Sequence, residues 1–369
     1  MSDIEKIIND AWEIKDQISK NSDKSITEAV SHILKELDQG KIRVAEKIDG
    51  KWVTHQYIKK AIMLSFRTHE KEVLQGPYSS WTDLSVYLKG KTADWGAEEF
   101  KKAGFRMLPN SPVRFGSFIN KNVVLMPCFV NVGAYIDENT MMDTNSRAGS
   151  CAQIGKNCHI SAGTGIGGVL EPAQALPTII EDDVFVGAMS EIVEGVIVEN
   201  IVGTGIEAHS FEPAPSDIRK LDSADVVIFN GLIFEPWITR SLAAISQKDR
   251  VIINVGEFEK SEEHENLSLD LPLIDHSHIH HKNTDLHIWL DPVLAKNQVQ
   301  IIQSGLVTAR PDAANAYETN AAALMRELDI LNSKFAVGMS NCVQNNFVTS
   351  HNAFGHLSRR YGLNQIPIS

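Results

Sequence analysis

The spacing of hydrophobic residues changes twice along this chain. Up to about residue 108 apolar residues recur at helical spacing, and from Phe118 to Val198 they recur at every sixth position. Beyond residue 200, short apolar runs alternate with amphipathic segments. Neither the helical period nor the strand period accounts for a repeat of six, so the central segment needs a different architecture from its neighbours.

The first 108 residues predict a small helical domain. Ile4, Ile7, Ile8 and Trp12 mark one amphipathic helix. A second helix carries Val30, Ile33, Leu34 and Leu37 on its buried face, and Ser25–Thr27 supplies a candidate cap. Residues 51–68 repeat the helical spacing and predict a third helix.

The six-residue repeat predicts a left-handed parallel β-helix. One apolar residue per repeat would point into a narrow core, and a small side chain follows many of them four residues later. The asparagines and glycine between the repeats suit tight turns with positive φ. The apolar series is Phe118, Val124, Val130, Ile136, Met142, Ala148, Ile154, Ile160, Ile166, Ile180, Val186, Ile192 and Val198, and the turn residues are Asn122, Asn139, Gly155 and Asn157.

The repeat is interrupted between Gly167 and Thr178. This segment is too long for a turn, so it predicts a loop extruded from the solenoid. Such a loop can serve assembly or a binding site, or be a tolerated insertion.

After residue 200 the pattern predicts a partial α/β lobe of Rossmann-like type. Residues 226–229 and 251–255 are short buried strands, and residues 292–306 form a helix with proline in its first turn. Residues 313–339 form one long helix. The whole chain therefore divides into a helical domain 1–108, a β-helix 109–199, an α/β lobe 200–312, a linker helix 313–342 and the start of a second α/β lobe 343–369.

Composition narrows the classes of function. A net charge of −12 argues against nucleic acid or an anionic membrane as partner. No apolar run is long enough to span a bilayer, and the N-terminus has no secretory signal, so we expect a cytoplasmic protein. The four cysteines have no CxxC spacing, and three fall within the repeat, which favours reduced core thiols.

Three histidines beyond residue 200 form a candidate metal site. His209, His287 and His351 each fall at the edge of an expected strand or helix, where neutral imidazoles are favoured Zn²⁺ ligands. Ordinary loop histidines are the alternative. An accessory metal tract, His276, His278, His280 and His281, lies between them, and a solvated loop is its alternative reading.

The stretches NVVLMPCFVNVGAYIDENTMMDT, GSCAQIGKNCHIS and PTIIEDDVFVGAMSEIVEGVIVE resemble 2,3,4,5-tetrahydropyridine-2,6-dicarboxylate N-succinyltransferases. The resemblance covers roughly residues 1–199. It implies transfer of a succinyl group from succinyl-CoA to L-2-amino-6-oxopimelate, a small dicarboxylate, in lysine and diaminopimelate biosynthesis. It also implies a homotrimer with sites between neighbouring β-helices.

The resemblance also implies roles for three residues. Asp143 matches the acid that contacts the substrate amine, Glu191 the candidate general base, and Arg106 the substrate-binding arginine. A carboxylate near the amine can take its proton, and a cation can bind a substrate carboxylate. After Asp143-Thr144 the family usually has Trp-Ala-Thr-Val, whereas this chain has Asn145-Ser146-Arg147-Ala148. The family's last coils, which supply much of the succinyl-CoA site, have no counterpart after residue 199, so we expect weak or absent transfer.

The stretches EAHSFEPAPSDIRKLDSADVVIF, DLHIWLDP and VTSHNAFGHLSRRYGLNQIPIS resemble the zinc-type solute-binding proteins of ABC metal importers. This resemblance covers roughly residues 201–369. It implies His209, His287 and His351 as ligands of Zn²⁺, with Mn²⁺ less favoured because the ligands are imidazoles.

Three hypotheses follow for the whole chain. It is an acyltransferase whose C-terminal part was exchanged, or a zinc-binding protein carried on a non-catalytic β-helix, or a non-functional chimera of two incomplete proteins. The two resemblances meet at one position, and one family is cytoplasmic while the other is exported.

Overall fold

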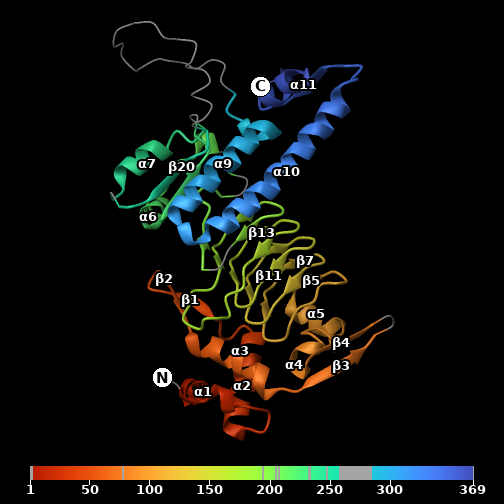
Figure 1. Cartoon of the computed structure of the whole chain (residues 1–369), viewed down its shortest axis with the longest axis vertical. Coiled ribbons are helices and arrows are strands. Elements are labelled where there is room, and N and C mark those ends of the chain that lie inside the picture. Colours follow the sequence, from red (N-terminus) through yellow and green to blue (C-terminus); the bar gives the residue numbers. More distant parts are fainter. Residues whose placement is uncertain are drawn as a thin grey trace. The chain divides into compact units, whose positions relative to one another are not determined.

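The computed structural model describes residues 3–76, 79–192, 195–203, 206, 208–231, 234–246, 248–256 and 285–368. The chain divides into two compact units, which are Met1–Gly205, the N-terminal unit, and Ile206–Ser369, the C-terminal unit (Figure 1). The predicted accessory tract, His276, His278, His280 and His281, lies outside the described residues.

The N-terminal unit begins with a helical region. Its helices are α1 (Asp3–Glu13), α2 (Lys24–Asp38), α3 (Gln56–Thr68), α4 (Ser85–Leu88) and α5 (Ala97–Ala103), with a 3₁₀ turn η1 (Lys15–Gln17). Two antiparallel hairpins join them, β1 (Ala45–Ile48) with β2 (Lys51–Thr54) and β3 (Lys71–Gln75) with β4 (Ser80–Leu84). Ile8 of α1, Leu34 of α2 and Ile62 of α3 are buried together, as their helical spacing predicts.

Two details of this region differ from the prediction. Asp23, not Ser25, caps α2, because its side chain accepts a 2.7 Å hydrogen bond from the Ser25 backbone N–H. Helix α3 begins at Gln56 rather than at residue 51, because Lys51–Thr54 pairs with Ala45–Ile48 as strand β2. Trp52 lies on this strand, and its indole N–H donates to Glu181 at 2.6 Å.

From Arg106 the chain winds in coils that place two-residue strands in three parallel sheets. The first sheet holds β5 (Arg106–Met107), β7 (Val124–Leu125), β10 (Met141–Met142), β13 (His159–Ile160) and β16 (Phe185–Val186). The second holds β8 (Phe129–Val130), β11 (Arg147–Ala148), β14 (Gly165–Ile166) and β17 (Glu191–Ile192). The third holds β6 (Phe118–Ile119), β9 (Tyr135–Ile136), β12 (Gln153–Ile154), β15 (Ile179–Ile180) and β18 (Ile197–Val198). Successive strands pass to the next sheet in rotation, which explains the repeat of six.

The second residue of each strand points into the core between the sheets. Ile136, Met142, Ile154 and Ile160 are fully buried there, as the repeat predicts. The prediction is wrong for Phe118 and Val124, because Ile119 and Leu125 occupy the inward positions. The register shifts because β7 and β8 start five residues apart, at Val124 and Phe129, instead of six.

One edge of the coils carries a ladder of asparagines. Asn122, Asn139 and Asn157 have φ of 59°, 61° and 55°, and amide-to-amide hydrogen bonds of 3.1 and 3.0 Å join them in sequence. The predicted positive φ is confirmed for these three. Gly155 is different: a Cβ there would lie 2.7 Å from the Asp182 backbone nitrogen, so close approach of the chain, not its φ, requires glycine.

The loop between Gly167 and Thr178 is held against α3 by a buried lysine. The Lys59 ammonium group donates to the carbonyl oxygens of Pro172 at 2.9 Å and Ala175 at 3.0 Å. Lys59 is fully buried. A buried charge requires such partners, so the loop is fixed by a contact that would be costly to break.

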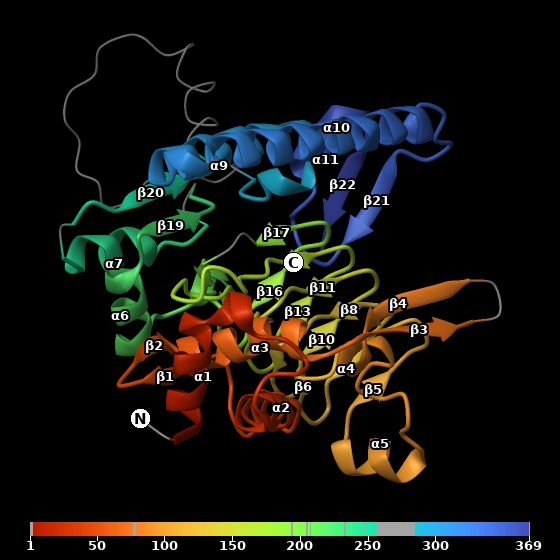
Figure 2. The same cartoon turned by 60° about the horizontal axis from the view of Figure 1, so that its bottom comes forward.

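The C-terminal unit alternates strands and helices. Its elements are η2 (Ala208–Ser210), α6 (Pro215–Ser223), β19 (Val226–Phe229), α7 (Ile238–Ala244), β20 (Val251–Asn254), η3 (Ile288–Leu290), α9 (Pro292–Ala309), η4 (Pro311–Ala313), α10 (Ala314–Met339), β21 (Asn346–Thr349), α11 (Gly355–Tyr361) and β22 (Asn364–Pro367). Strands β19 and β20 are parallel, as are β21 and β22. Figure 2 shows α9 and α10 side by side. No helix among the described residues has the length and apolar character needed to cross a membrane.

Candidate functional sites

The three histidines predicted as metal ligands come together in the C-terminal unit. His209 lies in η2, His287 immediately precedes η3, and His351 follows β21. One ligand atom from each lies within 4.8 Å of the other two. Residues far apart in sequence thus present three imidazole nitrogens to one point.

The spacing of these nitrogens suits a small metal ion. The Nε2 atoms of His287 and His351 lie 3.1 Å apart, and the rings of His209 and His287 are 5.9 Å apart at their centroids. Two nitrogens bound to one tetrahedral Zn²⁺ at about 2.05 Å lie roughly 3.3 Å from each other, which the observed spacing approaches. The donor set, three neutral nitrogens, fits Zn²⁺ better than Mn²⁺.

Asp285 orients His287 through the ring nitrogen that does not face the cluster. Its Oδ1 accepts hydrogen bonds from the His287 backbone N–H at 3.0 Å and from Nδ1 at 2.9 Å. Its Oδ2 accepts from the backbone N–H groups of Gly355 at 2.7 Å and His356 at 3.2 Å. Proton donation from Nδ1 leaves Nε2 free to bind a metal.

Asp285 is held in its charged form. Burial raises the pKa of its carboxyl, but the hydrogen bonds from His287, with those from its neighbours, outweigh burial and lower the pKa below its usual value. The same carboxylate therefore orients one histidine and anchors the start of α11, which follows His351 in the chain.

Aromatic rings flank the histidines. Phe234 packs edge-on against His209, with centroids 4.3 Å apart, and against Trp289 at 4.9 Å. Trp289 also lies 5.2 Å from His287. His209 and His287 are half-buried beside these rings, while His351 is exposed.

The candidate transferase residues lie on the N-terminal unit. Arg106 is in β5 and Asp143 follows β10, so both belong to the first sheet, where β7 lies between their strands. Glu191 is in β17 of the second sheet. Asp143 follows a strand of the first sheet and Glu191 begins a strand of the second, so both lie near the edge where the chain passes between these sheets, on coils separated by one further coil.

Each candidate carboxylate has a basic partner that the sequence analysis did not single out as functional. The Nε2 of His159 lies 3.7 Å from the Asp143 carboxylate, and the Arg147 guanidinium forms an ion pair with Glu191. His159 and Arg147 occupy outward positions of the six-residue repeat. Reading the outward residue of each repeat, not only the inward one, would have found them.

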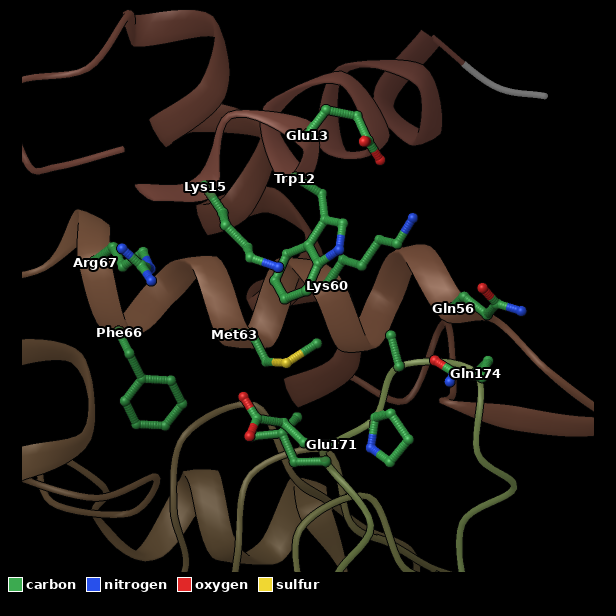
Figure 3. A pocket seen from close by; sticks show the side chains of 13 residues that line it. Trp12, Glu13, Lys15, Gln56, Lys60, Met63, Phe66, Arg67, Glu171 and Gln174 are labelled. Atoms are coloured by element: carbon green, nitrogen blue, oxygen red, sulfur yellow. The ribbon is translucent and has the colours of Figure 1, made fainter. Parts of the chain in front are cut away.

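A cavity of about 1120 Å³ lies elsewhere on the N-terminal unit. Figure 3 shows the loop residues Glu171 and Gln174 opposite Trp12 and Met63 of the helical region. The Lys15 ammonium group lies 4.4 Å from the centre of the Trp12 ring. No predicted site residue lines this cavity, so we place neither candidate chemistry there.

Two family models match the chain. The model described as tetrahydrodipicolinate N-succinyltransferase N-terminal matches residues 3–68. The model described as zinc-uptake complex component A, periplasmic, matches residues 187–369.

Curated relatives match the N-terminal part. The 2,3,4,5-tetrahydropyridine-2,6-dicarboxylate N-succinyltransferase of Pelagibacter ubique is 67% identical over 198 residues, which cover 54% of this chain and 72% of the relative. The enzyme of the same name from Idiomarina loihiensis is 49% identical over 209 residues, covering 56% of this chain and 75% of the relative.

Solved structures match the other part. The Zn(II)-bound ZnuA-like domain of Streptococcus pneumoniae AdcA is 30% identical with a TM-score of 0.38, covering 48% of this chain. The chain spans 59% of that solved domain, less than two thirds of its length.

Proposed function

Because the chain belongs to the 2,3,4,5-tetrahydropyridine-2,6-dicarboxylate N-succinyltransferase family through its N-terminal half, we propose that its N-terminal unit transfers succinyl groups from succinyl-CoA to the amine of L-2-amino-6-oxopimelate. We infer further that its coils form the left-handed β-helix predicted from the repeat and assemble as a homotrimer. The observation that carries the proposal is the placement of Asp143 and Glu191 at one edge of the coils.

The reaction needs groups of this kind. The substrate amine, an ammonium ion at neutral pH, must lose a proton before its nitrogen attacks the thioester carbonyl. The C–N bond then forms, the C–S bond breaks, and the thiolate of coenzyme A leaves and gains a proton. A carboxylate such as Glu191 can accept the ammonium proton, while Asp143 holds the nitrogen near the thioester. Arg106 suits a substrate carboxylate.

We propose that this transfer is slow. The Pelagibacter ubique relative is matched over 72% of its length, and residues 187–369 match the model described as zinc-uptake complex component A instead. We infer that the groups completing the succinyl-CoA site belong to the part of the relative that this chain does not match. The test is formation of the N-succinylated product by the purified full chain, measured by mass spectrometry. Product that persists unchanged in Asp143→Ala contradicts the proposed site.

A second activity is supported by the three-histidine cluster. We propose that His209, His287 and His351 bind one Zn²⁺, which would be held by three nitrogens with further positions open to water. The X-ray absorption spectrum of the zinc-loaded chain tests this directly. Three imidazole nitrogens at about 2.0–2.1 Å support the site, and a spectrum dominated by oxygen or sulfur ligands contradicts it.

The transferase-like unit and the zinc-binding unit stand in one sequence, and the peptide that spans their junction tests whether cells make them as one polypeptide. We propose a fusion in which each unit keeps its own site, located in the cytoplasm with the transferase substrates. Trypsin would release a peptide from Asn157 to Arg219, because no lysine or arginine lies between Lys156 and Arg219. Detection of this peptide in the source cells supports the fusion, whereas peptides from two separate proteins alone contradict it.

A further inference from the structure

Three residues on successive coils of the second sheet form an outward column. Arg147 of β11 is in register with Gly165 of β14, and Gly165 with Glu191 of β17. The middle residue has no side chain, so the Arg147 guanidinium extends across it to the Glu191 carboxylate. The pair therefore joins two coils that are not adjacent.

This ion pair is open to solvent. The Arg147 side chain is 51% exposed and that of Glu191 is 39% exposed. Exposed pairs of this kind contribute little to stability, because water screens the charges and two long side chains lose conformational freedom when they pair. A second carboxylate with better geometry can therefore displace Glu191 from the guanidinium at little cost.

We propose that Arg147 binds one carboxylate of the dicarboxylate substrate in exchange for Glu191, and that this exchange releases Glu191 to accept the proton of the substrate amine. The inference rests on the proposed succinyl transfer and deepens it. Arginine presents two parallel N–H donors that match a carboxylate, so the incoming group gains paired hydrogen bonds.

The exchange couples binding to proton transfer. Without substrate, Glu191 is paired with a cation and is not positioned as a base. When a substrate carboxylate pairs with the Arg147 guanidinium, Glu191 loses its cation. The ammonium group of the bound substrate is then the cation available to Glu191. The ammonium N–H bond then breaks, an O–H bond forms on Glu191, and no other bond changes in this step. Asp143 lies four residues before Arg147, and its Oδ1 accepts a 2.6 Å hydrogen bond from the Thr144 backbone N–H, which orients the carboxylate that would hold the same nitrogen.

The test uses pimelate, a seven-carbon dicarboxylate without an amine, titrated calorimetrically into the full chain. Arg147→Gln should weaken binding by about tenfold or more, because a charged hydrogen-bond donor is lost. Arg147→Lys should restore part of it. Glu191→Gln should bind pimelate more tightly than the wild type, because the internal competitor for Arg147 has lost its charge.

A matched control lies on the same coils. Lys156 forms an exposed ion pair with Glu138 at 3.5 Å, with side chains 47% and 41% exposed. Lys156→Gln removes a comparable surface cation and should leave pimelate binding unchanged.

Three results would overturn the inference. They are equal binding by Arg147→Gln and the wild type, weaker binding by Glu191→Gln, and no binding of pimelate by the wild type. The proposed function is decided separately, by product formation from succinyl-CoA and the amine substrate. Transfer without dependence on Arg147 would refute only the exchange.

Discussion

The Arg147 guanidinium reaches the Glu191 carboxylate across Gly165, two coils away along the same outward column. The resembled family motif usually has threonine at the position of this arginine, which here meets the residue that we propose as the general base. The glycine between them makes the contact possible, because a side chain at position 165 would meet the ends of both charged side chains.

Replacing Gly165 by alanine should separate the pair without unfolding the coils. A Cβ at this position would meet the ends of the Arg147 and Glu191 side chains, which are flexible. We expect the free energy of unfolding to change by about 0.5 kcal/mol or less. Gly149→Ala is the contrasting variant, because its Cβ would lie 2.6 Å from the Gly168 backbone Cα, which cannot move aside. It should destabilise by about 1–3 kcal/mol. Thermal and urea unfolding measure both, and equal losses would contradict this reading of the column.

Lys59 should be essential for the loop between Gly167 and Thr178. Lys59→Met removes both hydrogen bonds to the loop carbonyls of Pro172 and Ala175, so buried acceptors lose their donor. We expect a loss of about 1–3 kcal/mol in the free energy of unfolding, with faster amide hydrogen exchange in the loop. Lys60→Met is the control, because Lys60 bonds to Asn9 at 2.8 Å and not to the loop. An unchanged rate of amide hydrogen exchange in the loop of Lys59→Met would show that other contacts hold the loop.

The cysteines should differ sharply in reactivity. Burial raises the pKa of Cys128 and of Cys151 to about 12, and that of Cys158 to about 11, whereas Cys342 is exposed. The thiolate is the reactive form. Since a raised pKa keeps the thiol protonated until pH approaches that value, the three buried thiols should stay unlabelled at pH 8 in the folded chain. Mass spectrometry after alkylation should find Cys342 modified, and Cys342→Ser should remove that label. Rapid labelling of Cys151 in folded protein would contradict the buried position.

Asp285 should matter for zinc although it faces away from the cluster. In Asp285→Asn the side chain keeps its size but loses the charge that fixes the proton on His287 Nδ1. Loss of an outer carboxylate of this kind typically weakens metal binding by about 10–100-fold. Competition with a chelator measures the change. Asp312→Asn, which alters an exposed pair with Arg310 at 3.1 Å, should have no effect.

The repeat of six predicted the coils and their inward residues from Val130 onwards because, apart from the loop between Gly167 and Thr178, successive strands begin six residues apart. It failed at Phe118 and Val124, where two strands begin five residues apart. A change of spacing by one residue turns inward positions outward. Because Val124 and Leu125 are both apolar, the sequence does not show which of them points into the core.

The candidate sites were predictable to different degrees. The three histidines stood at element edges, and the structure brings them together. The Asp285 carboxylate that orients His287 is itself held by a hydrogen bond from the Gly355 backbone N–H, 70 residues away, which no local sequence pattern records. The partners of Asp143 and Glu191 were missed because contacts between coils join residues 16 and 44 positions apart, His159 with Asp143 and Arg147 with Glu191.

The central claim for the C-terminal unit is that His209, His287 and His351 form the zinc site. Calorimetric titration of Zn²⁺ into two variants of the full chain tests it most directly. In one variant the three histidines become alanine, and in the other His276, His278, His280 and His281 become serine. We predict that the second variant retains one tightly bound Zn²⁺ per chain and that the first loses it. Undiminished tight binding by the first variant would contradict the account and assign the metal to the tract instead.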